Sequence, residues 1–305
     1  MSMPIVRSSF AIDLLPIVRK FHDDKMKQLD PLTPKLFDVM PSDRAYEIMS
    51  VTMGLSTLQE KGENEDVSYD TDRQLYSPQF QHITYALGKK ISMEALQDAQ
   101  SINHAKRAGQ QLAKATALTE DILSANVINN AYTSGKTMTN GDGVILCSAS
   151  HPSPSGNQSN TITVNADLSE AALEALVIQI RKATDERGNR INLTPRKLVI
   201  PVDLEFEAKR ILGNPDRPAT ADRDINVINR EGIFPDGMVI SPYFSDPDQF
   251  LILTDADDGL IAFDRFSSEV ETDREFDTKA ACFSKVIRTS RGWVEWRKVF
   301  ASPGA

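Results

Sequence analysis

The chain has 305 residues, of which 40% are hydrophobic and 25% are charged, and these values are typical of a folded protein. The formal net charge of −9 disfavours a broad surface that binds nucleic-acid phosphates. Two cysteines, Cys147 and Cys282, are too few for a disulfide framework and favour a reducing interior, and no apolar run is long enough for a membrane span.

The first 45 residues are expected to form an arm with little regular structure. Its prolines prevent long regular elements, so we expect one short helix near Ile12–Lys27 and extended chain through Leu36, Phe37 and Met40. Something must cover the apolar side chains of this arm, either the core of the same chain or a neighbouring subunit. Both interpretations stay open from the sequence.

From Ser50 the apolar residues alternate with polar ones, which is typical of β-strands. One alternating run begins at Val51 and a second covers Ile83–Ile91, and we interpret the two runs as the legs of a long hairpin. The stretch from Lys61 to Asp72 between them is strongly acidic. It cannot collapse onto a core, so it should project into solvent or towards a partner.

A long amphipathic helix is predicted over residues 99–132. Apolar residues at steps of three and four share one face of it, namely Ile102, Ala105, Ala108, Leu112, Ala115, Leu118, Ile122, Ala125 and Ile128. Such a helix spans roughly 45 Å at about 1.5 Å per residue, and it is much longer than the usual helix of about 11–12 residues. Frequent charges exclude a membrane span. The helix is therefore expected to act as a strut against which other elements pack.

The remainder of the chain has the pattern of a mixed α/β region followed by return strands. Helices are expected over Ser169–Arg187, closed by Gly188, and over Asp203–Leu212. Short strands are expected at Val144–Cys147, Thr161–Val164, Leu198–Val202, Ile225–Ile228, Met238–Ile240, Phe250–Thr254 and Leu260–Phe263. The tail alternates again from Glu269 through Phe283 to Trp296.

Short motifs that would indicate a nucleotide or metal site are incomplete. Ser134–Thr137 resembles the end of a phosphate-binding loop, but Asn130 stands where the first glycine is needed. Asp255–Gly259 resembles the start of a calcium loop, but Phe266 stands at the position of the required glutamate. A β-turn explains these last residues better. We therefore predict no cofactor and no metal site.

No catalytic constellation is recognisable in the sequence. The histidines lack the spacing of a zinc site, and His151 is expected in a flexible loop with no nucleophile elbow to serve. Cys147 and Cys282 lie in strand-like apolar runs, where packing in the core is the usual role of a cysteine. A catalytic Cys or His assembled from distant segments stays open.

Several strings of residues follow one another in a characteristic order. They are Leu146–Pro152, Gly156–Asn157, Ser159–Thr161, Asp185–Gly188, Leu193–Pro201, Glu207–Leu212 and the ending Ala301–Ala305. With the order arm, hairpin, long helix, α/β region and return strands, they resemble the major capsid protein of tailed bacteriophages with the HK97 fold. Within this group, they resemble the Mu-like major head subunit family or a close relative of it. The strings cover about half of the chain, and the order of elements covers nearly all of it.

The resemblance implies an α+β protein with the HK97-type capsid fold. It implies an N-terminal arm at 1–49, an extended β-hairpin (E-loop) at 50–93 and a peripheral domain with a long spine helix at 94–159. An α/β axial domain would follow at 160–265, and 266–305 would return to the peripheral domain. The arm is shorter than in relatives with a long scaffolding segment, so we expect a separate scaffold or a protease-trimmed start.

The same resemblance implies a structural role in the virion. The subunit would self-assemble into hexamers and pentamers that form an icosahedral shell around packaged double-stranded DNA, without sequence-specific binding. A scaffold, a prohead protease, a portal and decoration proteins are the implied partners, and no enzymatic activity and no membrane contact are expected. No Lys–Asn pair for a covalent crosslink between subunits is identifiable.

We hypothesise that the acidic hairpin tip meets basic residues on an adjacent subunit. The candidates are Glu63, Glu65, Asp66, Asp70 and Asp72 on the tip, and Lys89, Lys90, Arg73, Lys106 and Arg107 on the neighbour. Each exposed pair contributes only about 0–1 kcal/mol, so affinity must come from area and multiplicity. The sequence does not choose between these basic residues.

Three other functions stay open from the sequence. An encapsulin-type shell that stores enzymes would have the same fold. A soluble cytosolic hydrolase would elute as a small oligomer in gel filtration, where a capsid subunit elutes as capsomers or shells. A tail or baseplate component would differ in the symmetry of its assemblies. Fold-level analogy alone does not decide between them.

Overall fold

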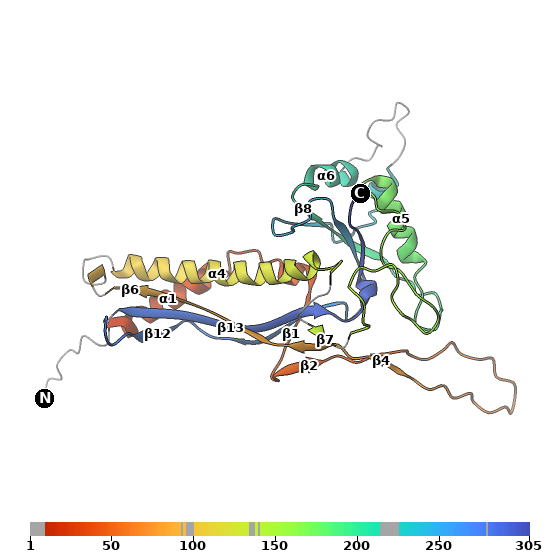
Figure 1. Ribbon diagram of the computed structural model, residues 1–305, viewed down its shortest axis with the longest axis horizontal. Helices are drawn as coiled ribbons and strands as arrows, with labels where there is room; N and C mark the ends of the chain where they lie inside the picture. The colour runs from red at the N-terminus through yellow and green to blue at the C-terminus, as the bar shows by residue number, and fades with distance from the viewer. Residues whose placement is uncertain are drawn as a thin grey trace. The chain divides into compact units, whose positions relative to one another are not determined.

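The computed structural model describes residues 10–92, 94–95, 101–133, 138–139, 141–213, 226–278 and 280–305, and Figure 1 labels its main elements. The chain divides into two compact units, each built from separate segments. The first unit contains Met1–Ala45, His82–Ser124 and Ala262–Ser290, and the second contains Tyr46–Gln81, Ala125–Ile261 and Arg291–Ala305. None of the helices in the described residues is long and apolar enough to span a membrane.

A five-stranded sheet forms one layer of the first unit. Its strands are β1 (Asp38–Pro41), β6 (Ile83–Ile91), β11 (Leu260–Ser267), β12 (Glu271–Arg274) and β13 (Ala281–Trp293). β6 runs antiparallel to β13, with Ile91 opposite Ala281 and Ile83 opposite Thr289. β13 also pairs with β11 and β12, so the alternating tail of the sequence forms the centre of this sheet.

Helices form the other layer of the first unit (Figure 1). They are α1 (Phe10–Met26), the single turn α2 (Thr33–Leu36) and the 29-residue helix α4 (Ser101–Asn129), which begins in this unit. Leu14 and Val18 of α1 pack with Ala105, Ala108 and Leu112 of α4 in one core cluster. That cluster also contains sheet residues such as Phe283. The short helix and the long strut are therefore confirmed.

The buried face of α4 differs in part from the predicted apolar stripe. Ile102, Leu118 and Ile122 are exposed. The polar residues Thr116 and Ser124 are buried instead. Their hydroxyls donate to the carbonyl oxygens of Leu112 and Glu120, four residues earlier, at 2.9 and 2.8 Å. Because this bond satisfies the hydroxyl within the helix, a polar residue can occupy the inward face.

A four-stranded sheet forms the core of the second unit. Its order is β14 (Val299–Ser302), β10 (Phe250–Thr254), β8 (Pro195–Pro201) and β9 (Met238–Ser241). β10 is antiparallel to both β14 and β8, whereas β8 and β9 are parallel. The helices of this unit are α5 (Glu170–Arg181), α6 (Glu205–Gly213), α7 (Val227–Arg230) and the 3₁₀ turn Trp296–Lys298.

Helix α5 covers this sheet through the residues that its spacing predicts. Ser169 is the N-cap, and its hydroxyl accepts a hydrogen bond from the amide of Ala172. Leu173, Leu176 and Ile180 are fully buried in the core cluster that contains Phe250 and Phe300. The sequence therefore predicts this helix and its inward face correctly.

The long hairpin exists, but its second leg differs from the prediction. The legs are β2 (Tyr46–Ile48) with β5 (Gln79–Gln81), followed by β3 (Val51–Thr52) with β4 (Gln74–Tyr76). A short strand, β7 (Met138–Thr139), pairs with the other edge of β5. The predicted leg Ile83–Ile91 is β6, which pairs with β13 in the first unit. Alternation identifies a strand but does not identify its partner.

Four further expectations are wrong. Val144–Cys147 and Thr161–Val164 form no strands, although Thr161 makes an isolated bridge to Ala301. α5 ends at Arg181, before the expected Arg187. Ile225 lies outside the described residues, and the residues after it form α7, capped by the Asn226 side chain.

Candidate subunit-contact surface

The loop at the end of the hairpin, residues 53–73, continues beyond the last strand pair (Figure 1). The amide of Met53 donates to the carbonyl oxygen of Arg73 at 2.8 Å. Beyond this bond, towards the tip, side-chain carboxylates accept the hydrogen bonds that backbone carbonyl oxygens would accept in a strand pair. Asp72 accepts from the amide of Gly54 at 3.0 Å, and Asp70 accepts from the amide of Ser56 at 2.8 Å. The loop therefore stays closed without regular strand pairing.

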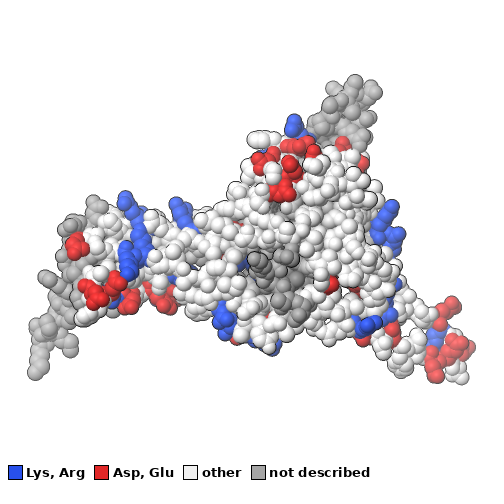
Figure 2. Space-filling model, in the orientation of Figure 1, with Lys and Arg blue, Asp and Glu red and all other residues white. Residues whose placement is uncertain are grey.

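The tip is a tight turn over Gly62–Glu65. The amide of Glu65 bonds to the carbonyl oxygen of Gly62, and Asn64 adopts a left-handed backbone with φ of 72°. The Glu65 carboxylate accepts from the amide of Gly62 at 2.8 Å. Figure 2 shows acidic side chains gathered at the end of this loop. Glu63 and Asp66 are exposed in the same turn.

Several of the predicted acidic contacts are already engaged within the loop. Asp70, Asp72 and Glu65 all accept backbone hydrogen bonds. The amides of Ser56 and Thr71, together with the charge of Arg187, lower the pKa of Asp70 to about 2. Because the folded pKa lies below the usual value of 3.8, this stabilisation is complete above about pH 4 and is lost as the pH falls through about 2. Glu63 and Asp66 make no ion pair among the described residues.

The basic residues that are predicted to contact a neighbouring subunit lie on several elements and do not form one cluster. Lys90 forms an ion pair with Glu275 at 2.7 Å, and this hydrogen bond raises the pKa of Lys90. Lys89 donates to the side chain of Gln111. The ammonium of Lys106 lies 4.9 Å from the centre of the Phe21 ring. Arg73 and Arg107 are exposed. Which of these residues contacts a neighbour stays a prediction.

Sequence reasoning missed the apolar character of the same loop. Leu58 and Tyr69 are 100% and 95% exposed, and Leu55 and Val67 are 68% and 61% exposed. Fully exposed large apolar side chains gathered on one segment indicate an interaction surface. Val67 and Tyr69 lie within the acidic stretch of the sequence and indicate this apolar surface, but the charged residues around them dominate the composition.

The second unit contains a buried polar cluster around His151, which is a correction to its expected place in a flexible loop. His151 is fully buried, and its Nδ1 lies 2.6 Å from Oδ2 of the buried Asp142. Its Nε2 lies 3.3 Å from Oδ1 of Asn160, and its ring stacks on Trp296 with centroids 4.4 Å apart. Both ring nitrogens are occupied and the ring is covered, so His151 cannot act on a substrate.

Arg297 forms the next layer of this cluster. Its guanidinium carbon lies 4.3 Å from the ring centre of Trp296, on which His151 also stacks. Nη1 of Arg297 donates to Glu186 at 2.8 Å and to Glu295 at 2.9 Å. Burial raises the pKa of Glu295, whereas the charge of Arg297 opposes that rise. The arrangement neutralises buried charges and holds separate segments together, which is a structural role.

The two cysteines are free thiols in the structure. Cys147 is buried, and burial raises the pKa of its thiol far above the usual value, which disfavours the nucleophilic thiolate. Cys282 is half-buried on β13. No group of three or more histidine, cysteine or acidic side chains in the described part of the chain could hold a metal ion.

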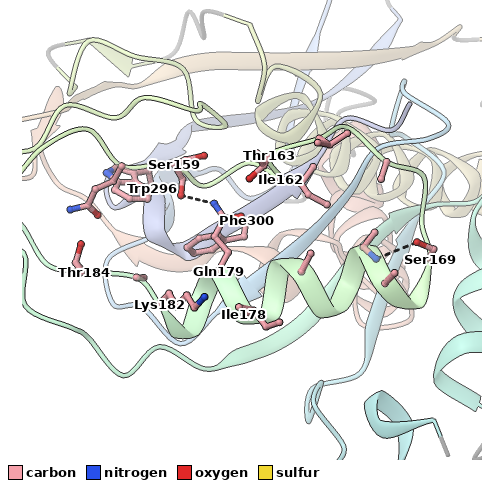
Figure 3. A pocket seen from close by; sticks show the side chains of 17 residues that line it. Ser159, Ile162, Thr163, Ser169, Ile178, Gln179, Lys182, Thr184, Trp296 and Phe300 are labelled. Carbon is pink, nitrogen blue, oxygen red and sulfur yellow. Dashed lines mark hydrogen bonds between the residues drawn. The ribbon is translucent and has the colours of Figure 1, made fainter.

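A groove of about 710 Å³ lies along α5 (Figure 3). Ile162 and Thr163 lie on one side, Ile178 and Lys182 of α5 on the other, and Phe300 contributes to the lining. Among the described residues of this lining, Lys182 is the single ionisable side chain. One ammonium without a second ionisable group in this described lining does not form a general acid–base pair, so this groove gives no support for a hydrolase.

The sequence of the chain matches the model of the phage capsid protein family over residues 76–302. The chain belongs to the phage capsid protein family. This match covers β5, α4, the four-stranded sheet, the five-stranded sheet except β1, and the buried His151 cluster. The resemblance and the capsid function drawn from the sequence are confirmed, and the encapsulin alternative is not better supported.

Solved structures confirm the HK97-type capsid fold of this capsid protein. A virus-like particle from Pyrococcus furiosus is similar over 94% of this chain and 98% of its own, with a TM-score of 0.55 and 13% identity. The capsid of bacteriophage JBD30 is similar over 71% of this chain and 92% of its own, with a TM-score of 0.55 and 13% identity. The capsid of the Myoviridae phage XM1 is similar over 88% of this chain and 90% of its own, with a TM-score of 0.51 and 11% identity. A comparison with curated protein sequences finds no match.

Three of the strings that carry the resemblance, Leu146–Pro152, Ser159–Thr161 and Asp185–Gly188, contribute residues to the buried polar cluster of the second unit. Asn160, from the string Ser159–Thr161, donates to the carbonyl oxygens of Leu146 and Val299 at 2.7 and 2.9 Å. His151 and Glu186, from two other strings, contact Trp296 and Arg297. His151, Asn160 and Glu186 themselves lie outside the named helices and strands, which explains why no helix or strand signal marks them in the sequence.

Proposed function

We propose that this capsid protein self-assembles into hexamers and pentamers, which form an icosahedral shell around packaged double-stranded DNA. In this proposal the hairpin loop of one subunit lies on a neighbouring subunit. The observation that carries it is the exposed apolar set Leu55, Leu58, Val67 and Tyr69. Packing within the chain leaves these side chains exposed to water. In a shell, a second copy of the chain would be the partner that covers them.

The energies favour the apolar residues over the charges as the main source of affinity. Burying one large apolar side chain contributes about 1.5–3 kcal/mol. An exposed ion pair contributes about 0–1 kcal/mol, and Asp70 and Asp72 are already engaged within the loop. The acidic tip would therefore set the register and the specificity of the contact, while Tyr69 and its apolar neighbours supply the affinity.

The functional segments stay those that the resemblance implies, with the hairpin ending at β5. The arm would lie at 1–49, the peripheral domain at 94–159 and 266–305, and the axial domain at 160–265. We propose no enzymatic activity and no sequence-specific DNA contact. A scaffold, a prohead protease, a portal and decoration proteins would act with the subunit, which would be made in the host cytoplasm before it enters the virion.

Charge reversal of the tip tests the role of the hairpin. Replacing Glu63, Glu65 and Asp66 by Lys should leave the subunit folded by circular dichroism but reduce the yield of closed particles in sedimentation. The matched control replaces the same residues by Gln, Gln and Asn, which removes charge with little change of shape. It should assemble better than the Lys variant. Normal particle yield from the Lys variant would contradict a tip contact.

The nucleic-acid content of purified particles separates a phage capsid from an enzyme-storing shell. Particles purified with the phage's packaging machinery should contain nuclease-protected double-stranded DNA. Particles that instead enclose a protein cargo and no DNA would favour the shell of a storage compartment. The fold does not decide this point, because one structural neighbour is a virus-like particle.

A further inference from the structure

The string Asp185–Gly188, part of the resemblance, has no role in the proposed shell so far. It forms a tight turn between α5 and β8 in the second unit. Oδ1 of Asp185 accepts from the amides of Arg187 and Asn189 at 2.9 and 2.7 Å. The amide of Gly188 donates to the carbonyl oxygen of Asp185, and Gly188 has a φ of +88°, which favours glycine. The backbone of this turn is therefore fixed from within.

The turn is also anchored to the core of the unit. Glu186 is buried and accepts from Nη1 of Arg297 at 2.8 Å. Burial raises the pKa of Asp185, but hydrogen bonds from the Asn189 side chain and from backbone amides outweigh that effect and lower it. Asp185 therefore stays ionised and keeps the turn closed. The residue between Glu186 and Gly188 makes its side-chain contacts outside the turn.

That residue is Arg187, whose guanidinium contacts both legs of the hairpin. Nε and Nη2 donate to the carbonyl oxygen of Gly54 at 3.2 and 2.9 Å. Nη2 also lies 3.2 Å from the carbonyl oxygen of Thr71 and 3.1 Å from Oδ2 of Asp70. The Arg187 side chain is only 19% exposed. Only the planar guanidinium offers enough donors at once for acceptors on two strands.

These contacts lie at the point where regular pairing of the hairpin ends. β3 ends at Thr52 and β4 begins at Gln74. Between these two residues, side-chain carboxylates hold the loop closed. We infer that the Asp185–Gly188 turn is a clamp for the hairpin, and that Arg187 is a positioning residue for subunit assembly. The clamp fixes the base of the loop to the Asp185–Gly188 turn of the same unit, so that the exposed tip is presented in one direction.

The inference rests on the proposed function for its effect on assembly, but not for its effect on the loop. Fixing a flexible loop in its bound conformation before contact reduces the entropy that binding must overcome. A loosened loop would keep every contact residue and still assemble less well. Loss of the clamp should therefore separate folding, which survives, from assembly, which weakens.

The test compares Arg187→Met with Arg190→Met in the full-length subunit. Arg190 lies in the same loop and is exposed, and it donates to the carbonyl oxygen of Lys182 rather than to the hairpin. With Arg187→Met, the amides of Gly54 and Ser56 should exchange with deuterium about tenfold faster, while exchange in β8 and β10 stays unchanged. Particle yield should fall several-fold. Arg190→Met should match the wild type in both measurements.

A second variant keeps the inference testable if Arg187→Met does not fold. Asp70→Asn retains the side-chain shape and removes the ion pair, and it should accelerate exchange at Ser56 with a smaller loss of particles. Unchanged exchange at Gly54 and Ser56 would overturn the clamp. Faster exchange with wild-type particle yield would overturn its role in assembly. If the wild type itself forms no particles, the proposed function fails, while the exchange result still decides the clamp.

Discussion

His151 shows how a single residue in this capsid protein was misjudged from the sequence. Its neighbours Ser150 and Pro152 indicate a loop, and the loop is real, but the imidazole is fully buried. The contacts come from Asp142 and Asn160, nine residues before and after His151, and from Trp296 near the end of the chain. A loop residue can therefore be a core residue when its partners come from other segments, and no local pattern reveals such partners.

Replacing His151 by Ala should strongly destabilise the unassembled subunit. The change leaves the carboxylate of Asp142 buried without its partner and removes a ring stacked on Trp296. The expected loss in the free energy of unfolding is about 3–5 kcal/mol, measured by urea denaturation. His104→Ala on α4 is the control, because His104 is half-buried, and it should cost about 1 kcal/mol or less. Equal losses for both variants would contradict the assigned role of His151.

Gly109 is the residue at which α1 and α4 approach each other. A Cβ atom at this position would lie 2.4 Å from the carbonyl oxygen of Val18 and 3.1 Å from the amide nitrogen of His22. Both atoms belong to the backbone, so the helices would have to move apart. Gly109→Ala should therefore lower the free energy of unfolding by about 1–3 kcal/mol, although Ala favours helix.

Gly213→Ala is the matched control for that substitution. Gly213 is the last residue of α6, and a Cβ atom added to it would meet no described atom within 4 Å. This variant should be as stable as the wild type or slightly more stable. If Gly109→Ala proves equally harmless in urea denaturation, the close packing of the two helices is wrong.

At the scale of elements, the sequence predicts existence better than pairing. Helix α4 and strand β10 are predicted close to their observed bounds, and α5 is predicted correctly at its start but not at its end, because long amphipathic periodicity and short apolar runs are local signals. The predicted partner of β6, the run beginning at Val51, is wrong, because β6 pairs with β13, a strand far along the chain. Thr116 and Ser124 were missed on the buried face of α4, since apolar spacing cannot identify hydroxyls that bond to their own helix.

The candidate contact surface was predicted only in part for a related reason. The projecting hairpin and its acidic tip follow from composition. The engagement of Asp70 and Asp72 with backbone amides and the clamp by Arg187 depend on contacts across the fold. The sequence therefore indicates where the surface lies, and the structure shows which of its residues are available to a partner.

Tyr69→Ala should weaken assembly more than Glu63→Gln. Tyr69 is 95% exposed and carries a large apolar surface, whereas Glu63 contributes one exposed charge. A loss of about 1.5–3 kcal/mol per contact raises the concentration needed for assembly by roughly tenfold or more. Light scattering as a function of subunit concentration measures this threshold. A larger effect from Glu63→Gln would mean that charge, rather than apolar area, drives the contact.

At the scale of the whole molecule, the chain carries features that fit contacts with a neighbouring copy. The hairpin loop is held by Arg187 at its base and leaves Leu58 and Tyr69 in water at its far part. The buried His151 cluster is closed, and the groove along α5 has one ionisable residue in its described lining. These features fit a subunit whose function arises from contacts between copies.

Electron cryomicroscopy of the purified protein tests this account most directly. We predict closed icosahedral particles built from hexamers and pentamers, with residues 53–73 of each subunit lying on an adjacent subunit and Tyr69 covered. A protein that remains a monomer or small oligomer under assembly conditions would contradict the account. So would closed particles in which this loop folds back on its own subunit.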